Sequence, residues 1–128
     1  MSAQRQRISS GSPYEPQIGF SRAVRAGDRV LVSGTAPIWP EGNCDPEPER
    51  QARRCLEIIL AALREAGAGP EHVVRTRIYL TAAADYQAVG RAHGAVFGAI
   101  RPASTMVVVA ALLDPRWKVE IEAEAIVD

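Results

Sequence analysis

The chain has 128 residues, a length that fits one domain with an ordinary hydrophobic core. Its 15 basic and 15 acidic residues give a formal net charge of zero, so composition offers no long-range attraction to nucleic acid or to an anionic membrane. No apolar stretch approaches the ~20 residues of a membrane-spanning helix, and none follows the polar N-terminus to form a secretory signal. We therefore expect a cytoplasmic protein without nucleic-acid or membrane partners.

The N-terminal part predicts a lead-in followed by a β-hairpin. Residues 1–17 are rich in Ser, Gly and Pro and predict a loose lead-in with at most one short strand, before a single domain over residues 18–128. Residues 19–26 and 29–33 predict two strands joined by a turn at Gly27-Asp28. Several prolines then make residues 37–48 a loop, because proline fixes φ and removes a hydrogen-bond donor.

The remainder alternates between helical and strand patterns. Apolar residues recur at helical spacing over residues 49–66, and Gly67, Gly69 and Pro70 end that helix. Residues 72–80 predict a strand, and residues 86–97 a second helix, with capping residues at 81–85. Residues 105–112 and 118–127 predict the last two strands. This order indicates an α+β fold in which two helices cover one face of a single sheet.

The other face of that sheet carries charge. Strand alternation places one set of side chains together on one face of the fourth strand, namely Val74, Thr76, Ile78 and Leu80. Arg75, Arg77 and Tyr79 then lie on the opposite face, and the last strand likewise gathers Glu120, Glu122 and Glu124 on one face. Two interpretations stay open at this point: a solvated sheet face, or a surface where arginine and glutamate pair between chains.

Three motifs in order resemble a known family. They are Val30-Leu-Val-Ser-Gly34, Arg101-Pro-Ala-Ser-Thr-Met106, and Lys118-Val-Glu-Ile-Glu-Ala-Glu124. Together they resemble the reactive-intermediate deaminase family (Rid, also YjgF/RidA), often labelled endoribonuclease L-PSP, over roughly residues 18–127. The resemblance implies a chorismate-mutase-like sheet, a homotrimer built around a central barrel, and ligand clefts between neighbouring chains.

The resemblance also implies roles for individual residues. Glu120 takes the place of the carboxylate that positions or activates the attacking water in the family's deaminases. The substrate-binding residues implied are Phe20, Ser33, Gly34, Ser104, Thr105 and Met106. Arg101 has two interpretations, as a residue that reaches into the cleft or as an exposed loop arginine.

Ser104 departs from the family pattern at an important position. The deaminating members carry an arginine there, whose guanidinium pairs with the carboxylate of a 2-imino acid. A buried charge pair of that kind is worth about 2–5 kcal/mol on truncation, whereas a neutral serine hydrogen bond contributes about 1 kcal/mol. The usual small 2-imino acids are therefore poor candidate substrates, unless Arg22, Arg25 or Arg101 compensates.

Other residues give weaker functional signals. Glu120 also fits a plain sheet-face glutamate paired with arginine, and His93 lies on the apolar face of the second helix, as a packed histidine does. The two histidines and two cysteines show no metal-ligand spacing, and no Gly-rich phosphate loop is present. We expect neither a metal nor a cofactor.

Three functions remain to be compared. The first is hydrolytic deamination of an enamine- or imine-type compound other than the usual small 2-imino acids. The second is a non-catalytic trimer that binds a small metabolite in the same clefts. Ribonuclease activity ranks last, because the chain shows neither a basic surface nor clustered aromatic residues.

Overall fold

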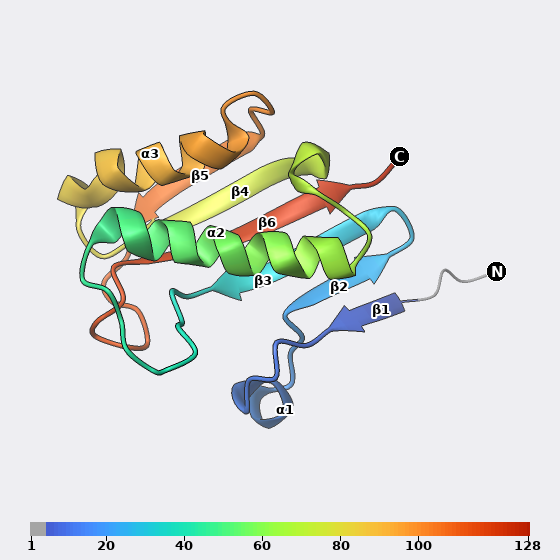
Figure 1. Ribbon diagram of the computed structural model, residues 1–128, viewed down its shortest axis with the longest axis horizontal. Coiled ribbons are helices and arrows are strands. Elements are labelled where there is room, and N and C mark those ends of the chain that lie inside the picture. Colours follow the sequence, from blue (N-terminus) through green and yellow to red (C-terminus); the bar gives the residue numbers. More distant parts are fainter. Residues whose placement is uncertain (1–4) are drawn as a thin grey trace.

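The computed structural model describes residues 5–128, so the first four residues of the expected lead-in lie outside the described residues. One six-stranded sheet runs in the order β1-β2-β3-β6-β4-β5 (Figure 1). The strands are β1 (Arg5–Ile8), β2 (Ala23–Ala26), β3 (Arg29–Thr35), β4 (Val73–Leu80), β5 (Ala103–Val108) and β6 (Val119–Ile126). Neighbouring strands are antiparallel except β4 and β5, which are parallel.

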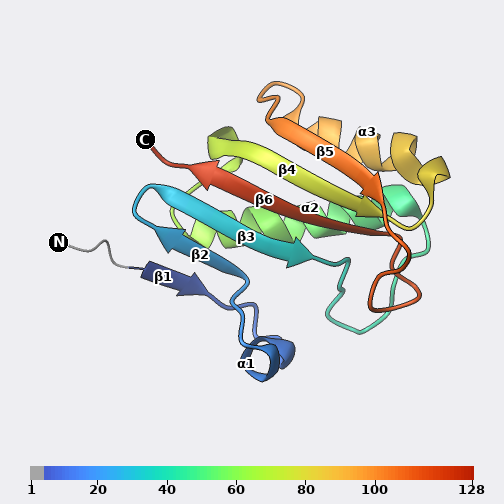
Figure 2. The ribbon, with the colours of Figure 1, turned by 180° about the vertical axis from the view of Figure 1, so that it is seen from behind.

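Two long helices cover one face of this sheet. The helices are α1 (Tyr14–Ile18), α2 (Pro48–Glu65) and α3 (Tyr86–Phe97), with 3-10 turns η1 (Pro70–His72) and η2 (Ala83–Asp85). Figures 1 and 2 show α2 and α3 on the same side of the sheet, while the other side, seen from behind, carries no helix. The predicted fold, a single sheet with two helices on one face, is confirmed. No helix within residues 5–128 is both long and apolar enough to cross a membrane.

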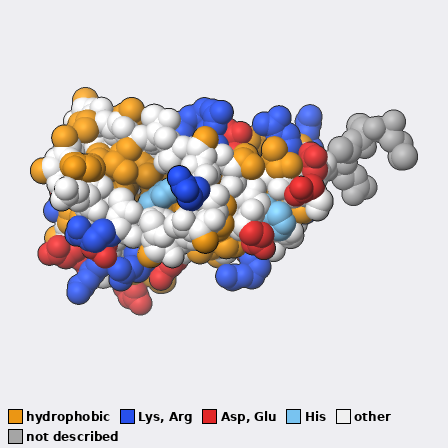
Figure 3. All heavy atoms as spheres, turned by 90° about the horizontal axis from the view of Figure 1, so that it is seen from above, with side chains coloured by type: hydrophobic (Ala, Val, Ile, Leu, Met, Phe, Trp, Pro, Cys, Tyr) orange, Lys and Arg blue, Asp and Glu red, His pale blue; other side chains and the backbone are white. Residues whose placement is uncertain are grey.

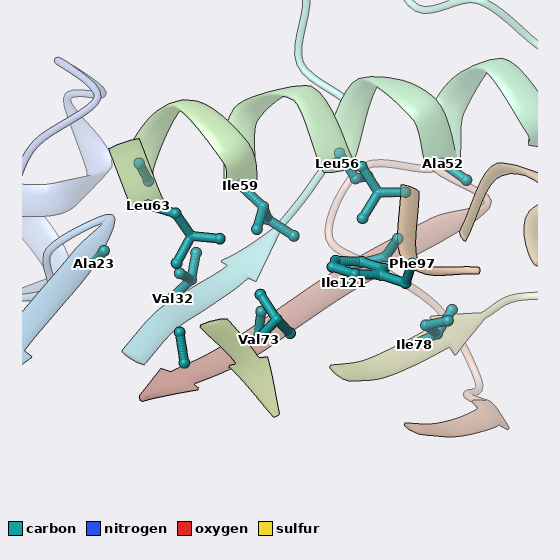
Figure 4. Close-up of a cluster of buried hydrophobic side chains, with 14 of the residues drawn as sticks. Ala23, Val32, Ala52, Leu56, Ile59, Leu63, Val73, Ile78, Phe97 and Ile121 are labelled. Atoms are coloured by element: carbon teal, nitrogen blue, oxygen red, sulfur yellow. The ribbon is translucent and has the colours of Figure 1, made fainter. Parts of the chain in front are cut away.

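The core lies between α2 and the sheet. Leu56, Ile59 and Leu63 recur at helical spacing on α2 and are almost completely buried. Figure 4 shows them above side chains of the central strands, including Val32 and Ile121. Pro48 begins the helix at a position where its missing N–H is harmless, and Gly67, with φ of 80°, follows its end. Burial of this stripe fixes the sheet beneath α2, and hence the position of β6.

Two predicted strands differ from those observed. The strand expected over 19–26 begins only at Ala23, because Tyr14–Ile18 forms the short helix α1, which Gly19 ends in a left-handed conformation with φ of 94°. The strand expected over 105–112 is Ala103–Val108 instead. Its parallel partner β4 stops at Leu80, whose carbonyl accepts the last bond from the N–H of Val109. Beyond that residue no strand is available for pairing.

The expected face of Val74 was wrong. Thr76, Ile78 and Leu80 are buried under the helices as predicted, but Val74 is 43% exposed and Val73 is buried in its place. The pairing of β4 with β6 is irregular between Val73 and Arg75. An irregularity of this kind shifts by one residue the alternation of side chains between the two faces of the sheet. The sequence pattern does not show where such a shift occurs.

Candidate functional site

Glu120 lies directly over Gly34 on the open face of the sheet. Its Oε2 stands only 2.5 Å from where a Cβ on Gly34 would be, so no larger residue fits there without displacing the carboxylate. Gly34 can come this close because the pairing of β3 with β6 shifts between Val32 and Thr35. Burial raises the pKa of Glu120, the nearby Arg22 opposes that rise, and Glu122 adds to it. A half-buried carboxylate with a raised pKa is suited to proton transfer.

The start of β6 is held in place by a buried glutamine that the sequence interpretation overlooked. Gln51 on α2 is fully buried, and its Oε1 accepts a 2.8 Å hydrogen bond from the N–H of Lys118. Its Nε2 donates to the carbonyl oxygens of Asp45 and Arg116 at 2.8 and 3.0 Å. These bonds hold the loop before α2 and the loop before β6 against the start of α2. Glu120, two residues after Lys118, therefore projects from a fixed strand.

Arg22 supplies a positive charge at the same end of the sheet. Its Nη2 donates a 2.7 Å hydrogen bond to the carbonyl oxygen of Gly34, and its guanidinium carbon lies 5.7 Å from the centroid of the Phe20 ring. The residue is only 9% exposed, and its Nε has no hydrogen-bond partner among the described residues. Burial lowers the pKa of Arg22, while Glu15 and Glu120 raise it. Arg22 thus anchors the Gly34 backbone and counters the charge of Glu120.

Phe20 and Ser33 line an open hollow beside this cluster. The hollow has a volume of about 500 Å³, and Glu15, Ser21 and Val24 also line it. The Ser33 hydroxyl donates a 2.7 Å hydrogen bond to the Ser21 carbonyl, so it braces the hollow's wall. Four residues predicted for the site therefore lie close to one another at this end: Phe20, Ser33, Gly34 and Glu120.

The predicted residues of β5 lie at the opposite edge of the sheet. Ser104 is exposed, yet its Oγ accepts a 2.8 Å hydrogen bond from Thr76, which places it on the helix-covered face. Met106, two residues on, packs against the core cluster from the same face. Thr105 pairs with Arg77 in the ladder and lies on the open face. Figure 3, which views the α3 and β5 side of the molecule, shows exposed hydrophobic side chains there.

The three candidate substitutes for the missing arginine occupy different places. Arg101 follows α3, is exposed, and has a positive φ of 58°. Arg25 donates to the carbonyl oxygens of Gly27 and Ala66, which turns it away from the Glu120 cluster. Arg22 alone contacts the backbone of Gly34. Of the three, only Arg22 adds charge to the site.

A single chain separates the two parts of the predicted site. Glu120 projects from the open face of β6, next to β3, whereas Ser104 lies on the helix-covered face of the edge strand β5. β4 stands between these two strands in the sheet. Ser104 and Glu120 of one chain therefore cannot contact the same small ligand.

The charged open face is paired within the chain. Nη1 of Arg77 lies 3.6 Å from Glu122 and 3.8 Å from Glu124, and the Tyr79 hydroxyl donates to Glu122. Glu120 takes no part in these ion pairs. This distinguishes Glu120 from the two glutamates with which it shares the strand face, and it favours the functional interpretation of Glu120.

His93 packs as expected but also takes part in hydrogen bonding. Its ring lies 4.8 Å from that of Phe97, centroid to centroid, and its Nε2 lies 2.8 Å from Oγ1 of Thr76. Burial lowers the pKa of His93. Among residues 5–128 no group of three His, Cys, Asp or Glu side chains has the proximity needed to hold a metal ion.

Comparison with known proteins identifies the family. The sequence model of the endoribonuclease L-PSP family matches residues 11–127. An uncharacterized protein of Streptomyces coelicolor is 42% identical over 124 residues, covering 93% of this chain and 90% of that protein. A RutC family protein of Sinorhizobium fredii is 37% identical over 108 residues, with coverages of 81% and 83%.

Solved structures give the same answer. A YjgF/YER057c/UK114 family member of Mycobacterium tuberculosis superposes with a TM-score of 0.90 at 44% identity, covering 97% of this chain and all of that one. Escherichia coli TdcF, solved with bound serine, superposes with a TM-score of 0.83 at 25% identity, covering 100% and 99%. The matched sequence model and the close structural superposition show that this chain belongs to the YjgF/Rid family, also called the endoribonuclease L-PSP family.

Proposed function

We propose that this protein is a cytoplasmic homotrimer that binds a small metabolite in clefts between neighbouring chains and deaminates it by hydrolysis. The substrate is an enamine- or imine-type compound other than the usual small 2-imino acids. The observation that carries this proposal is the Glu120 carboxylate, half-buried over Gly34, with its pKa raised by burial and outside the ion pairs of the open face. A carboxylate so placed can accept a proton from water near neutral pH.

The reaction needs only this carboxylate and a water molecule. Glu120 takes a proton from water as the oxygen attacks the carbon of the C=N bond, whose electron pair moves to nitrogen. Glu120 passes that proton to the nitrogen, which gives a neutral carbinolamine. Glu120 then takes the proton of the hydroxyl as the carbonyl forms and the C–N bond breaks, and it delivers this proton to the departing nitrogen, which leaves as ammonia. Arg22 favours the ionised form of Glu120, because its positive charge opposes the effect of burial on the Glu120 pKa. No metal or cofactor enters these steps.

An assembly of several chains is proposed because one chain holds only half of the site, and the family resemblance implies that this assembly is a trimer. The Glu120 end and the Ser104 end lie on opposite faces of the sheet, so a ligand that touches both requires two chains. The exposed edge of β5, where Val107 and Val108 are 43% and 53% exposed, offers apolar surface for such a contact. The relative TdcF, solved with bound serine, supports a ligand of amino-acid size.

A non-catalytic trimer that senses or sequesters a metabolite is the second candidate. The observation that favours it is Ser104, which supplies one neutral hydroxyl where the family's deaminases carry an arginine. Ribonuclease activity remains the least supported function, because the formal charge of zero offers no attraction to the phosphate backbone.

Ammonia release separates the two candidates. We would measure it from enzymatically generated imines with short, bulky and neutral side groups, for wild type and for Glu120→Gln. The matched control is Glu124→Gln, which alters the same face of the same strand but removes a carboxylate that is paired with Arg77. Deamination predicts turnover by wild type and by Glu124→Gln, and its loss in Glu120→Gln.

Binding and mass complete the test. If wild type binds a ligand without releasing ammonia from any imine, the non-catalytic candidate replaces the deaminase. Light scattering should give three times the 13.8 kDa chain mass for all three proteins. A monodisperse monomer would contradict the intersubunit cleft itself.

A further inference from the structure

Three side chains from three elements form a continuous hydrogen-bonded chain under α3. His93 on α3 places Nε2 2.8 Å from Oγ1 of Thr76 on β4, and that Oγ1 lies 2.8 Å from Oγ of Ser104 on β5. The parallel pairing of β4 with β5 sets Thr76 directly beside Ser104. The three residues are therefore connected by the topology, although they are far apart in sequence.

The chain of hydrogen bonds leads from the interior to the surface. Thr76 has no exposed area, His93 is half-buried against Phe97, and Ser104 is exposed. A buried hydroxyl keeps its hydrogen bonds because losing them is costly, so Thr76 retains both partners. Ser104 is the most exposed of the three and is therefore the end that we expect a ligand to reach.

The proton count allows two directions. Thr76 has one proton to donate. If Thr76 donates to Ser104, then His93 must donate from Nε2 to Thr76, and the Ser104 proton is left to point outward. If Thr76 donates to His93 instead, Ser104 donates its proton to Thr76 and presents only lone pairs to a ligand. The tautomer of His93 therefore decides whether Ser104 is a donor or an acceptor.

We propose that His93 and Thr76 are positioning residues that hold the Ser104 hydroxyl as an outward hydrogen-bond donor. The 2.8 Å separations on both sides of Thr76 Oγ1 fit this arrangement, in which His93 donates to Thr76 and Thr76 donates to Ser104. The proposal rests on the proposed function insofar as Ser104 lies in the ligand cleft. It names the ligand's chemistry at that end: a neutral group with an acceptor oxygen, such as a carbonyl or amide oxygen.

With its O–H pointing outward, Ser104 would select a different class of ligand from the arginine that the family's deaminases carry. A single neutral donor satisfies one carbonyl oxygen, but it leaves the charge of a carboxylate uncompensated. The outward proton is what a ligand oxygen would accept, while the second lone pair of Ser104 Oγ stays free for a neighbouring donor group. The relay therefore defines a ligand class without adding charge to the site.

The tautomer of His93 is measurable without any ligand. The chain has two histidines, so ¹⁵N NMR of wild type beside His93→Phe assigns the His93 signals. We expect a protonated Nε2 and an unprotonated Nδ1 in wild type above the His93 pKa, which burial lowers. A protonated Nδ1 with Nε2 as acceptor would reverse the polarity and overturn the proposal, whatever reaction the protein catalyses.

Ligand binding tests the consequence with matched variants. The probe is pyruvamide, a small neutral compound with two acceptor oxygens, and its binding is followed at the Ser104 backbone amide. Thr76→Val keeps the shape but removes the hydroxyl, so we expect affinity to fall about fivefold, the equivalent of one hydrogen bond. Thr76→Ser keeps the hydroxyl and should bind pyruvamide with an affinity close to that of wild type. His93→Gln keeps a hydrogen-bond donor and should retain more affinity than His93→Phe.

The outcomes separate this inference from the proposed function. Equal affinities for Thr76→Val and Thr76→Ser would show that the hydroxyl does nothing beyond packing. If the NMR signal of the Ser104 backbone amide in wild type does not change when pyruvamide is added, the proposed ligand class is wrong. A wild-type protein that binds pyruvamide with these differences among the Thr76 variants, but releases no ammonia from any imine, would count against the proposed reaction alone.

Discussion

The two ends of the candidate site differ in the chemistry of their side chains, ionisable at one end and largely neutral at the other. At the β3–β6 end, ionisable groups meet at a close backbone approach: Glu120 lies over Gly34, with Arg22 beside it. At the β5 edge, neutral hydroxyls and an imidazole form a relay that ends at Ser104. The first end is equipped to move a proton, and the second to orient a ligand. One chain keeps them on opposite faces, so the proposed cleft takes one end from each of two neighbouring chains.

Mixing two inactive variants gives the strongest test of this division. Glu120→Gln removes the carboxylate, and Ser104→Tyr blocks the other end. Co-refolded in equal amounts, they should recover about a quarter of wild-type turnover, because one in four clefts in randomly mixed trimers draws both intact ends from different chains. Each variant refolded alone is the control. No recovery on mixing would mean that the two ends do not share a cleft between chains.

Replacing Ser104 by arginine should convert the ligand preference. Ser104→Arg restores the guanidinium of the family's deaminases, and we expect ammonia release from 2-iminopropionate to rise by at least ~30-fold, the lower bound for a buried charge pair. Thr105→Arg, one residue away and on the other face, is the matched control and should gain nothing. An active wild type would instead indicate that Arg22 already binds the carboxylate.

Crowding the Gly34 position should affect only the ionisable end. A Cβ there would lie 2.5 Å from Oε2 of Glu120, so Gly34→Ala displaces the carboxylate. We expect kcat to fall about tenfold, less than the ~100-fold that a 1 Å misplacement can cost, because the flexible Glu120 side chain can yield, with little change in pyruvamide affinity. Gly90→Ala on α3, where an added Cβ meets nothing within 4 Å, is the control. Equal kcat values for the two variants would argue against a role for the Glu120 position.

The smallest expected effect is a shift in pH dependence. Burial raises the pKa of Glu120 from 4.5, so kcat/KM should decline on the acid side at a pH above 4.5 as the carboxylate takes up a proton. Arg22 opposes that rise, so Arg22→Gln should move the decline to higher pH. Arg25→Gln, which alters a side chain bound to Gly27 and Ala66, should leave it in place. A decline that Arg22→Gln leaves unmoved would belong to another group.

Periodicity was enough to predict the sheet and its two covering helices. The alternation over β6 and the apolar stripe of α2 are local signals, and both elements lie where they were expected. The five-residue helix α1 was missed because it is too short for a helical pattern and contains Pro16. The exposure of Val74 was missed because an irregular ladder leaves no mark in the sequence.

The sequence predicted the candidate site less completely than the fold. Glu120, Ser33 and Gly34 were assigned through the family resemblance, and the structure adds why glycine stands at 34. The relay depends on the register that sets Thr76 beside Ser104, a contact across 28 residues that no spacing rule supplies. Arg22 was only one of three arginines that remained open, and its contact with the Gly34 carbonyl singles it out.

The position of β6 has a consequence for how the protein is made. This strand is the last of the six in chain order, yet it lies between β3 and β4 in the middle of the sheet. Until it leaves the ribosome, the hairpin of β2 and β3 has no ladder to the β4–β5 pair, and the two halves of the chain can fold only separately. The strand that carries the Glu120 carboxylate is thus also the one that joins those halves. A nascent chain that stops before residue 119 would lose the centre of the sheet rather than an edge.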